Sequence, residues 1–168
     1  MGPYGITGAT GTLRATVTIR DGGPGYDGWA VDQGVIGNAS PLEDQNQDGY
    51  MNLYHYAMGV PLTSSIDTDF PDLVPRVDGA FFDGRASLFF SIPEDPVDDI
   101  NFEVEESFDM ETWTVVATKE GADDWTFSFP TLVIPETPKD GRQGVLVAAS
   151  KTYSQQKLAY YRLKVRLK

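Results

Sequence analysis

The feature that most constrains the fold is a repeated alternation of apolar and polar residues in the second half of the chain. In the last segment, residues 160–168, the apolar Tyr161, Leu163, Val165 and Leu167 alternate with basic residues. A period of two indicates a half-buried β-strand, because successive side chains of a strand point to opposite faces of the sheet. Five more strand-like segments precede it, separated by clusters of Pro, Gly and Asp: residues 86–92, 100–107, 112–118, 124–129 and 144–150. Short strands between turn clusters predict a mainly β chain, with an antiparallel β-sandwich of the immunoglobulin or jelly-roll kind over residues 63–168.

The first third of the chain has a different pattern. Residues 13–19 alternate like a strand, so residues 1–22 are predicted to end a preceding domain or to add to the edge of the sandwich. Residues 27–33 predict a short helix that carries Trp29 inward, and apolar residues from Tyr50 onward follow helical spacing up to Gly59, a natural helix C-cap. Residues 23–62 are therefore predicted to be a helix–loop–helix segment. Residues 60–85 read as a loop, since they contain three prolines and a polar run.

The charge of the chain limits its partners. Thirteen basic and 25 acidic side chains give a formal net charge of −12, which argues against nucleic acid or an anionic membrane as the main partner. Residues 94–111 carry nine acids and no base, whereas residues 151–168 carry six bases and no acid. This distribution predicts solvated faces of adjacent strands that attract one another. The chain has no cysteine, which excludes disulfides, thiolate metal sites and cysteine nucleophiles.

The loop before the second predicted helix carries the most specific pattern. A calcium loop of the EF-hand type places oxygen ligands at positions 1, 3 and 5, glycine at position 6, a backbone carbonyl at position 7 and further oxygens at positions 9 and 12. Calcium requires six to eight hard oxygens, and a coiled loop aims alternate side chains at the ion. This chain meets the first six requirements in order with Asp44, Asn46, Asp48, Gly49, the carbonyl of Tyr50 and Asn52. The spacing predicts a Ca²⁺ site.

Position 12 of this loop departs from the pattern, because His55 stands where a bidentate glutamate is usual. Imidazole is a softer ligand that prefers zinc, copper or nickel, so it does not substitute for two carboxylate oxygens. Either Glu43, Asp32 or Asp27 completes the shell, or the site is weak, with an affinity nearer the ~10⁻⁴–10⁻³ M of extracellular modules. The alternative is an Asx-rich turn that caps the helix without metal.

The order of these features resembles a known family. The loop matches the form D-x-D-x-D-G-x-x-N-L-x-E-Y-A-x-G of thrombospondin type 3- or dockerin-like calcium loops, except at His55. A tryptophan-bearing helix precedes that loop in the C-terminal module of large secreted and surface proteins of environmental Gram-negative bacteria, and a β-domain follows it. That β-domain contains a V-E-x-S-x-D-L-x-x-W strand pair and ends in an F-x-R-L-x-V strand. The corresponding stretches here are VEESFDMETW, residues 104–113, and YYRLKVRL, residues 160–167.

The resemblance covers residues 26–168 and implies a non-catalytic, calcium-stabilised module at the end of an exported multidomain protein. Its partners would be the neighbouring domains of that protein, and its place would be secreted or on the cell surface. The resemblance implies no particular ligand, because such modules accompany many activities. The alternative function is carbohydrate binding by a flat aromatic platform. The candidates for that platform are Trp113, Trp125, Tyr153, Tyr160 and Tyr161.

Catalytic interpretations of other motifs are weak. Residues 6–14, ITGATGTLR, are similar to a dinucleotide-binding turn, but a strand pattern follows them where a helix is needed, and Arg14 replaces the third glycine. Neighbouring acids such as Glu105 and Glu106 point to opposite faces of a strand, so they cannot form a hydrolytic pair. His55 is the only histidine, and no G-x-S-x-G motif exists. The chain is therefore predicted not to be an enzyme.

Overall fold

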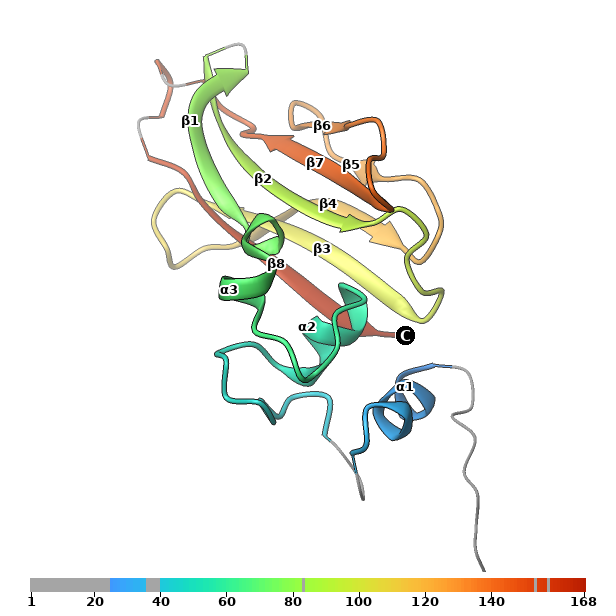
Figure 1. Ribbon diagram of the computed structural model, residues 1–168. Helices are drawn as coiled ribbons and strands as arrows, with labels where there is room; N and C mark the ends of the chain where they lie inside the picture. The colour runs from blue at the N-terminus through green and yellow to red at the C-terminus, as the bar shows by residue number, and fades with distance from the viewer. Residues whose placement is uncertain (1–24, 36–39, 83, 153, 157) are drawn as a thin grey trace, which may run out of the picture.

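Two antiparallel sheets make up most of the computed structural model, which describes residues 25–35, 40–82, 84–152, 154–156 and 158–168 (Figure 1). The first sheet has the strand order β1-β2-β7-β6, and the second has the order β5-β4-β3-β8. This arrangement confirms the prediction of a mainly β chain with antiparallel sheets. The strand predicted at residues 13–19 lies outside the described residues. The strands are β1 (Arg76–Phe82), β2 (Arg85–Pro93), β3 (Ile100–Ser107), β4 (Thr114–Glu120), β5 (Thr126–Phe127), β6 (Leu132–Pro135), β7 (Arg142–Ala148) and β8 (Tyr160–Leu167).

Alternation builds the central strands as the sequence predicts. In β2, Leu88 and Phe90 are buried, and they stand directly opposite Val147 and Val145 of β7. In β3, Phe102 and Val104 are fully buried. Tyr161, Leu163 and Val165 of the neighbouring strand β8 pack against the same core. Each central strand thus contributes one apolar face to the space between the sheets.

Within the described residues, four short helical elements precede the sandwich. They are α1 (Tyr26–Asp32), α2 (Asn52–Ala57), α3 (Ile66–Asp69) and the 3-10 helix η1 (Pro71–Leu73). Trp29 of α1 packs on Tyr26 and Tyr56, with ring centroids 5.7 Å and 5.4 Å apart. Asp99, just before β3, accepts hydrogen bonds from the Tyr26 backbone N–H at 3.2 Å and the Tyr56 hydroxyl at 2.7 Å. Helices α1 and α2 are therefore both attached to the start of β3.

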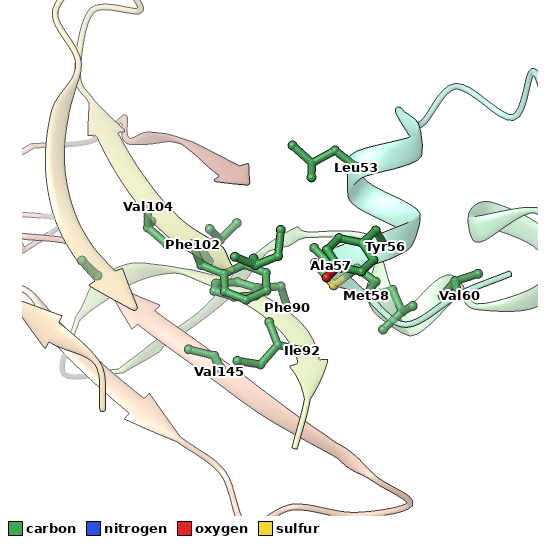
Figure 2. Close-up of a cluster of buried hydrophobic side chains, with 14 of the residues drawn as sticks. Leu53, Tyr56, Ala57, Met58, Val60, Phe90, Ile92, Phe102, Val104 and Val145 are labelled. Carbon is green, nitrogen blue, oxygen red and sulfur yellow. The ribbon is translucent and has the colours of Figure 1, made fainter. Parts of the chain in front are cut away.

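The helices and the sheets share one hydrophobic core. Figure 2 shows Tyr56, Ala57 and Met58 at the end of α2 directed toward Phe90 and Phe102 of the two sheets. Met58, Phe90 and Phe102 have no exposed surface. The helical segment is consequently packed onto the sandwich rather than suspended beside it.

Three predictions about element boundaries were wrong. The stretch predicted as a loop over residues 60–85 contains α3, η1 and β1. Among the described strands β1 pairs only with β2, and its Val77 is 57% exposed, so no alternation marks the strand. The strand predicted at residues 124–129 is reduced to the two residues of β5, and β6 was missed because prolines bound it.

Candidate functional site

The Asp44 loop, residues 44–52, coils back on its first carboxylate. Asp44 Oδ1 accepts a hydrogen bond from the Asp48 backbone N–H at 3.2 Å, and Oδ2 accepts one from the Gly49 N–H at 2.9 Å. Gln47 and Gly49 have positive φ angles of 60° and 93°. Glycine suits position 49 of the chain, because a left-handed backbone strains residues with a Cβ atom. The sequence thus forms the tight coil that its Asx and Gly spacing predicts.

Asp48 is the most heavily used side chain of the loop. Its carboxylate accepts hydrogen bonds from the backbone N–H groups of Tyr50 at 3.0 Å and Ile66 at 2.8 Å. The Nε2 atom of His55 lies 3.3 Å from Oδ1 and 3.2 Å from Oδ2 of the same carboxylate. Burial raises the pKa of Asp48, but the hydrogen bonds from Ile66, Tyr50 and His55 outweigh it and hold that pKa below its usual value.

This contact explains what His55 does at position 12 of the loop. The imidazole is completely buried, and its Nε2 carries a proton, because an ionised carboxylate can only accept. His55 therefore helps to hold the Asp48 carboxylate in place. Its Nδ1 atom is buried without a hydrogen-bond partner among the described residues.

The two asparagines of the loop differ in what they leave open. Asn52 is fully buried; its Oδ1 accepts from the Gln45 backbone N–H at 3.2 Å, and its Nδ2 donates to the Ser40 carbonyl at 3.3 Å. Asn46 donates through Nδ2 to the Ser64 carbonyl at 2.7 Å, whereas its Oδ1 is buried with no partner in the described part of the chain. Asn46 therefore retains an unused oxygen acceptor, while Asn52 braces the loop.

The donor set fits a hard cation in its chemistry. Asp44, Asn46 and Asp48 supply carboxylate and amide oxygens within one coil, and Tyr50 follows at the position of the carbonyl ligand. Among the described residues no group of three or more His, Asp or Glu side chains lies close enough to hold a metal. An ion here would therefore take most of its shell from amide, carbonyl and water oxygens. The sequence suggested three acids that could complete the shell of the ion. Asp27 and Asp32 lie in α1, and the side chain of Glu43 is exposed.

Sequence reasoning missed the residues that fix the loop to the rest of the molecule. Three hydrogen bonds join the loop to segment 64–67. Asn46 donates to the Ser64 carbonyl, and Asp48 accepts from the Ile66 N–H. The Tyr50 hydroxyl donates to the Asp67 carboxylate at 2.7 Å. The only signal in the sequence was an isoleucine within the polar run TSSIDTD. That Ile66 is fully buried.

The second motif, VEESFDMETW, forms the β3–β4 hairpin. The Ser107 hydroxyl accepts from the Asp109 and Met110 backbone N–H groups, and Asp109 Oδ1 accepts from those of Glu111 and Thr112 at 2.8 and 2.7 Å. Met110 adopts a φ of 63° at the tip. The serine and the aspartate of the motif are thus turn-forming residues.

The motif of the last strand completes this hairpin from β8. The Arg162 guanidinium lies 4.2 Å from the centre of the Trp113 ring and also forms an ion pair with Glu105. Lys164 reaches Glu105 at 2.7 Å, and Arg166 reaches Glu103 at 3.1 Å. Burial raises the pKa of Glu105, but Arg162 and Lys164 bring it below the usual range. The predicted attraction between acidic and basic strand faces is confirmed.

The aromatic residues proposed for sugar stacking have other contacts. Arg162 covers one face of Trp113, and Trp125 packs against Phe90 in the core with ring centroids 5.9 Å apart. The Tyr161 hydroxyl donates to the Ala86 carbonyl at 3.1 Å. Tyr153 lies outside the described residues. These contacts direct at least two of the predicted rings toward the interior of the molecule.

Comparison with known proteins gives no match: no family model, no curated protein and no solved structure is similar to this chain. No helix in the described part of the chain is long and apolar enough to cross a membrane. The features that bear on function are therefore the Asp44 loop, the hairpin and the surfaces around them.

Proposed function

We propose that this chain is a non-catalytic accessory module of an exported multidomain protein, stabilised by calcium in the Asp44 loop. The observation that supports it best is the linkage between loop and core. Asn46, Asp48 and Tyr50 each contact segment 64–67, whose Ile66 is buried in the core that α2 shares with the sheets. An ion held by the loop would order this segment and so stabilise the junction between helices and sandwich.

Asp44, Asn46, Asp48 and the Tyr50 carbonyl would hold the ion, and the second lone pair of Asn52 Oδ1 would assist. The free Oδ1 of Asn46 favours this assignment, because an unpaired buried acceptor costs free energy unless a cation or water satisfies it. Since His55 replaces the glutamate, water would supply the missing oxygens, and the affinity would fall in the millimolar range typical of weak extracellular sites, ~10⁻⁴–10⁻³ M.

The accessory role rests on the order of the motifs. A tryptophan-bearing helix, the Asp44 loop, the β3–β4 hairpin and the final basic strand follow one another as in the exported modules that the sequence resembles. The hairpin and the last strand meet through Glu105, Arg162 and Trp113, which gives these motif residues a structural role. Such a module would space or attach the neighbouring domains of its parent protein.

Thermal unfolding of the full chain tests the calcium part. With about 10 mM CaCl₂, ten- to a hundredfold above the expected dissociation constant, linkage predicts about 1.4–2.7 kcal/mol of added stability. For a chain of this size that is a rise in Tm of roughly 3–10 °C relative to EDTA, and Mg²⁺ should give much less. An identical melt in calcium and in EDTA would remove calcium from the proposal.

A matched pair of variants locates the ion. Asp44→Asn keeps one oxygen that can accept from Asp48 but removes the charge and the acceptor of the Gly49 N–H. It should therefore lower the Tm in EDTA and also abolish the calcium-induced shift. Asp72→Asn removes the same charge at a side chain that is 86% exposed, and it should keep the full shift. Equal shifts in both variants would place the ion elsewhere.

A further inference from the structure

A second site lies at the opposite end of β3 from the helices. There a cleft of about 420 Å³ opens between the β3–β4 hairpin and residues 128–131, which connect β5 to β6. Its lining is rich in hydroxyl groups and includes two acids, Glu106 and Asp109, and two aromatic rings, Phe108 and Phe129. The lining includes Glu106, Ser107, Thr112, Ser128, Phe129 and Thr131.

Glu106 gives the cleft a buried acceptor. The side chain belongs to a residue only 4% exposed, and its two oxygens accept from the backbone N–H of Ser150 at 3.0 Å and from the Ser150 hydroxyl. Within the described residues no basic side chain forms an ion pair with Glu106, in contrast to Glu105 on the same strand. The Tyr161 hydroxyl also faces this carboxylate, which has about four acceptor positions, so at least one of them stays open. Burial of a carboxylate without a cation is costly unless other donors satisfy it.

Thr131 adds a second unsatisfied group. The residue is 1% exposed, and its hydroxyl has no hydrogen-bond partner among the described residues. A hydroxyl can donate as well as accept, so it complements another hydroxyl. Glu106 and Thr131 together present polar atoms that a ligand with several hydroxyl groups would satisfy.

Phe129 forms the rim of the cleft and is 90% exposed, more than any other large apolar residue described. The segment that carries it is fixed: the Ser128 N–H donates to the Val116 carbonyl at 3.1 Å, and the Thr131 N–H donates to the Ser128 carbonyl at 2.9 Å. The ring is thus presented to solvent by a hydrogen-bonded turn. An exposed aromatic face beside buried acceptors matches the two sides of a sugar ring, which has apolar C–H groups and equatorial hydroxyls.

The charges around the cleft favour a neutral ligand. Arg85 donates to the carbonyls of Pro130 and Ser150, both of which belong to cleft-lining residues. Lys151 Nζ lies 4.4 Å from the centre of the Phe108 ring, so two positive charges adjoin a lining that carries two acids. A cation would meet Arg85, and an anion would meet Glu106 and the exposed Asp109. A purely apolar ligand would leave Glu106 and Thr131 unsatisfied.

We propose that this cleft binds a neutral carbohydrate, with a pyranose ring stacked on Phe129 and its hydroxyls bonded to Glu106 and Thr131. This site is independent of the calcium loop. It also differs from the platform expected from Trp113 and Trp125, because the exposed ring is a phenylalanine that the sequence does not mark.

Affinity electrophoresis of the full chain tests the proposal in native gels cast with mixed-linkage β-glucan, xylan or galactomannan, with alginate as the anionic polysaccharide and plain gels as reference. The wild-type chain should be retarded in at least one neutral gel and not selectively in alginate. Phe129→Ala should weaken that binding about tenfold, the order expected for loss of a stacking ring. Glu106→Gln, which keeps the shape of the side chain, should weaken it as well.

Phe127→Ala is the matched control, because Phe127 is 49% exposed on the neighbouring strand β5 but does not line the cleft. It should bind like the wild type. Unchanged melting curves would show that the exposed-ring variants fold. The proposal is overturned by absence of retardation in every neutral gel, by retardation in alginate alone, or by equal weakening in Phe129→Ala and Phe127→Ala.

Discussion

The Asp44 loop and the β3–β4 hairpin use the same kinds of side-chain to backbone hydrogen bond, but they differ in how their buried polar atoms are paired. Both use short polar side chains to accept backbone N–H groups, and both contain a non-glycine residue with positive φ, Gln47 at 60° and Met110 at 63°. In the hairpin, Arg162 and Lys164 neutralise Glu105, one of the two buried acids of the motif. In the loop, Asn46 Oδ1 remains without a partner in the described part of the chain.

This difference shows what each motif depends on. The hairpin is completed by another strand of the same chain, so the contacts of Glu105 and Trp113 are explained by folding alone. In the described part of the chain, His55 is the one basic side chain paired with an acid of the loop, and it faces Asp48 but not Asp44. A motif whose polar atoms are all paired is structural, whereas one with a buried unpaired acceptor is a better candidate for a ligand.

The largest expected effect is on the loop. Asp48→Ala removes the acceptor of the Tyr50 and Ile66 N–H groups and leaves the fully buried His55 without its partner. Loss of one member of a buried hydrogen-bonded pair costs about 3 kcal/mol, so urea unfolding should show a loss of stability of that order.

The control for this prediction is Asp72→Ala. Asp72 is 86% exposed and lies 3.9 Å from Arg76, and such a surface pair contributes less than about 0.5 kcal/mol. A loss in Asp48→Ala no greater than in Asp72→Ala would mean that the Asp48 carboxylate does not hold the loop to segment 64–67.

The hairpin should respond less. Glu105→Ala breaks the contacts with Arg162 and Lys164, but both bases are partly exposed and can turn to solvent. We expect a loss of about 1–2 kcal/mol in urea unfolding, below that of Asp48→Ala. Arg162→Ala should couple with it in a double-mutant cycle, because the guanidinium contacts Glu105 and the Trp113 ring together.

Glu103→Ala is the internal comparison on the same strand. Its partners Arg166 and Lys164 lie at 3.1 and 3.6 Å, and the Glu103 side chain is more exposed than that of Glu105, 17% against 8%. Its loss should be smaller and should shrink further in high salt. A loss in Glu103→Ala equal to that in Glu105→Ala would show that burial of the acid does not set the strength of the pair.

The sequence predicts those strands in which apolar and polar residues alternate within the strand itself. The strands β3 and β8 alternate clearly, and the opposite charges of residues 94–111 and 151–168 predicted that their strands would be neighbours. Edge strands carry less information. Strand β1 is held by backbone bonds to β2, and β6 has only four residues, so neither shows a period.

The same reasoning separates the two candidate sites. The Asp44 loop could be predicted because its oxygens lie within nine residues, and local spacing determines which side chains converge. Its attachment to Ile66 and the pairing of His55 with Asp48 depend on how the chain folds back. The cleft combines Glu106, Phe129 and Thr131 from separate elements, and no local pattern brings a strand end and a distant turn together.

The smallest effect concerns the tip of the hairpin and appears only in acid. Backbone N–H groups of Thr112 and Glu111 and the Ser107 hydroxyl lower the pKa of Asp109 to about 2. Because the folded-state pKa lies below the unfolded value, near 4, the ionised carboxylate stabilises the hairpin above about pH 4 and loses this contribution as the pH falls toward 2.

Carbon-detected NMR should therefore show the Asp109 carboxyl titrating with a midpoint near pH 2. Asp109→Asn keeps an oxygen acceptor but cannot ionise, so its Tm should fall less than that of the wild type between pH 5 and pH 3. A titration midpoint near 4, or parallel Tm losses in the two proteins, would mean that the turn does not hold the charged form. The hairpin would then share with the Asp44 loop a polar motif that the fold alone does not satisfy.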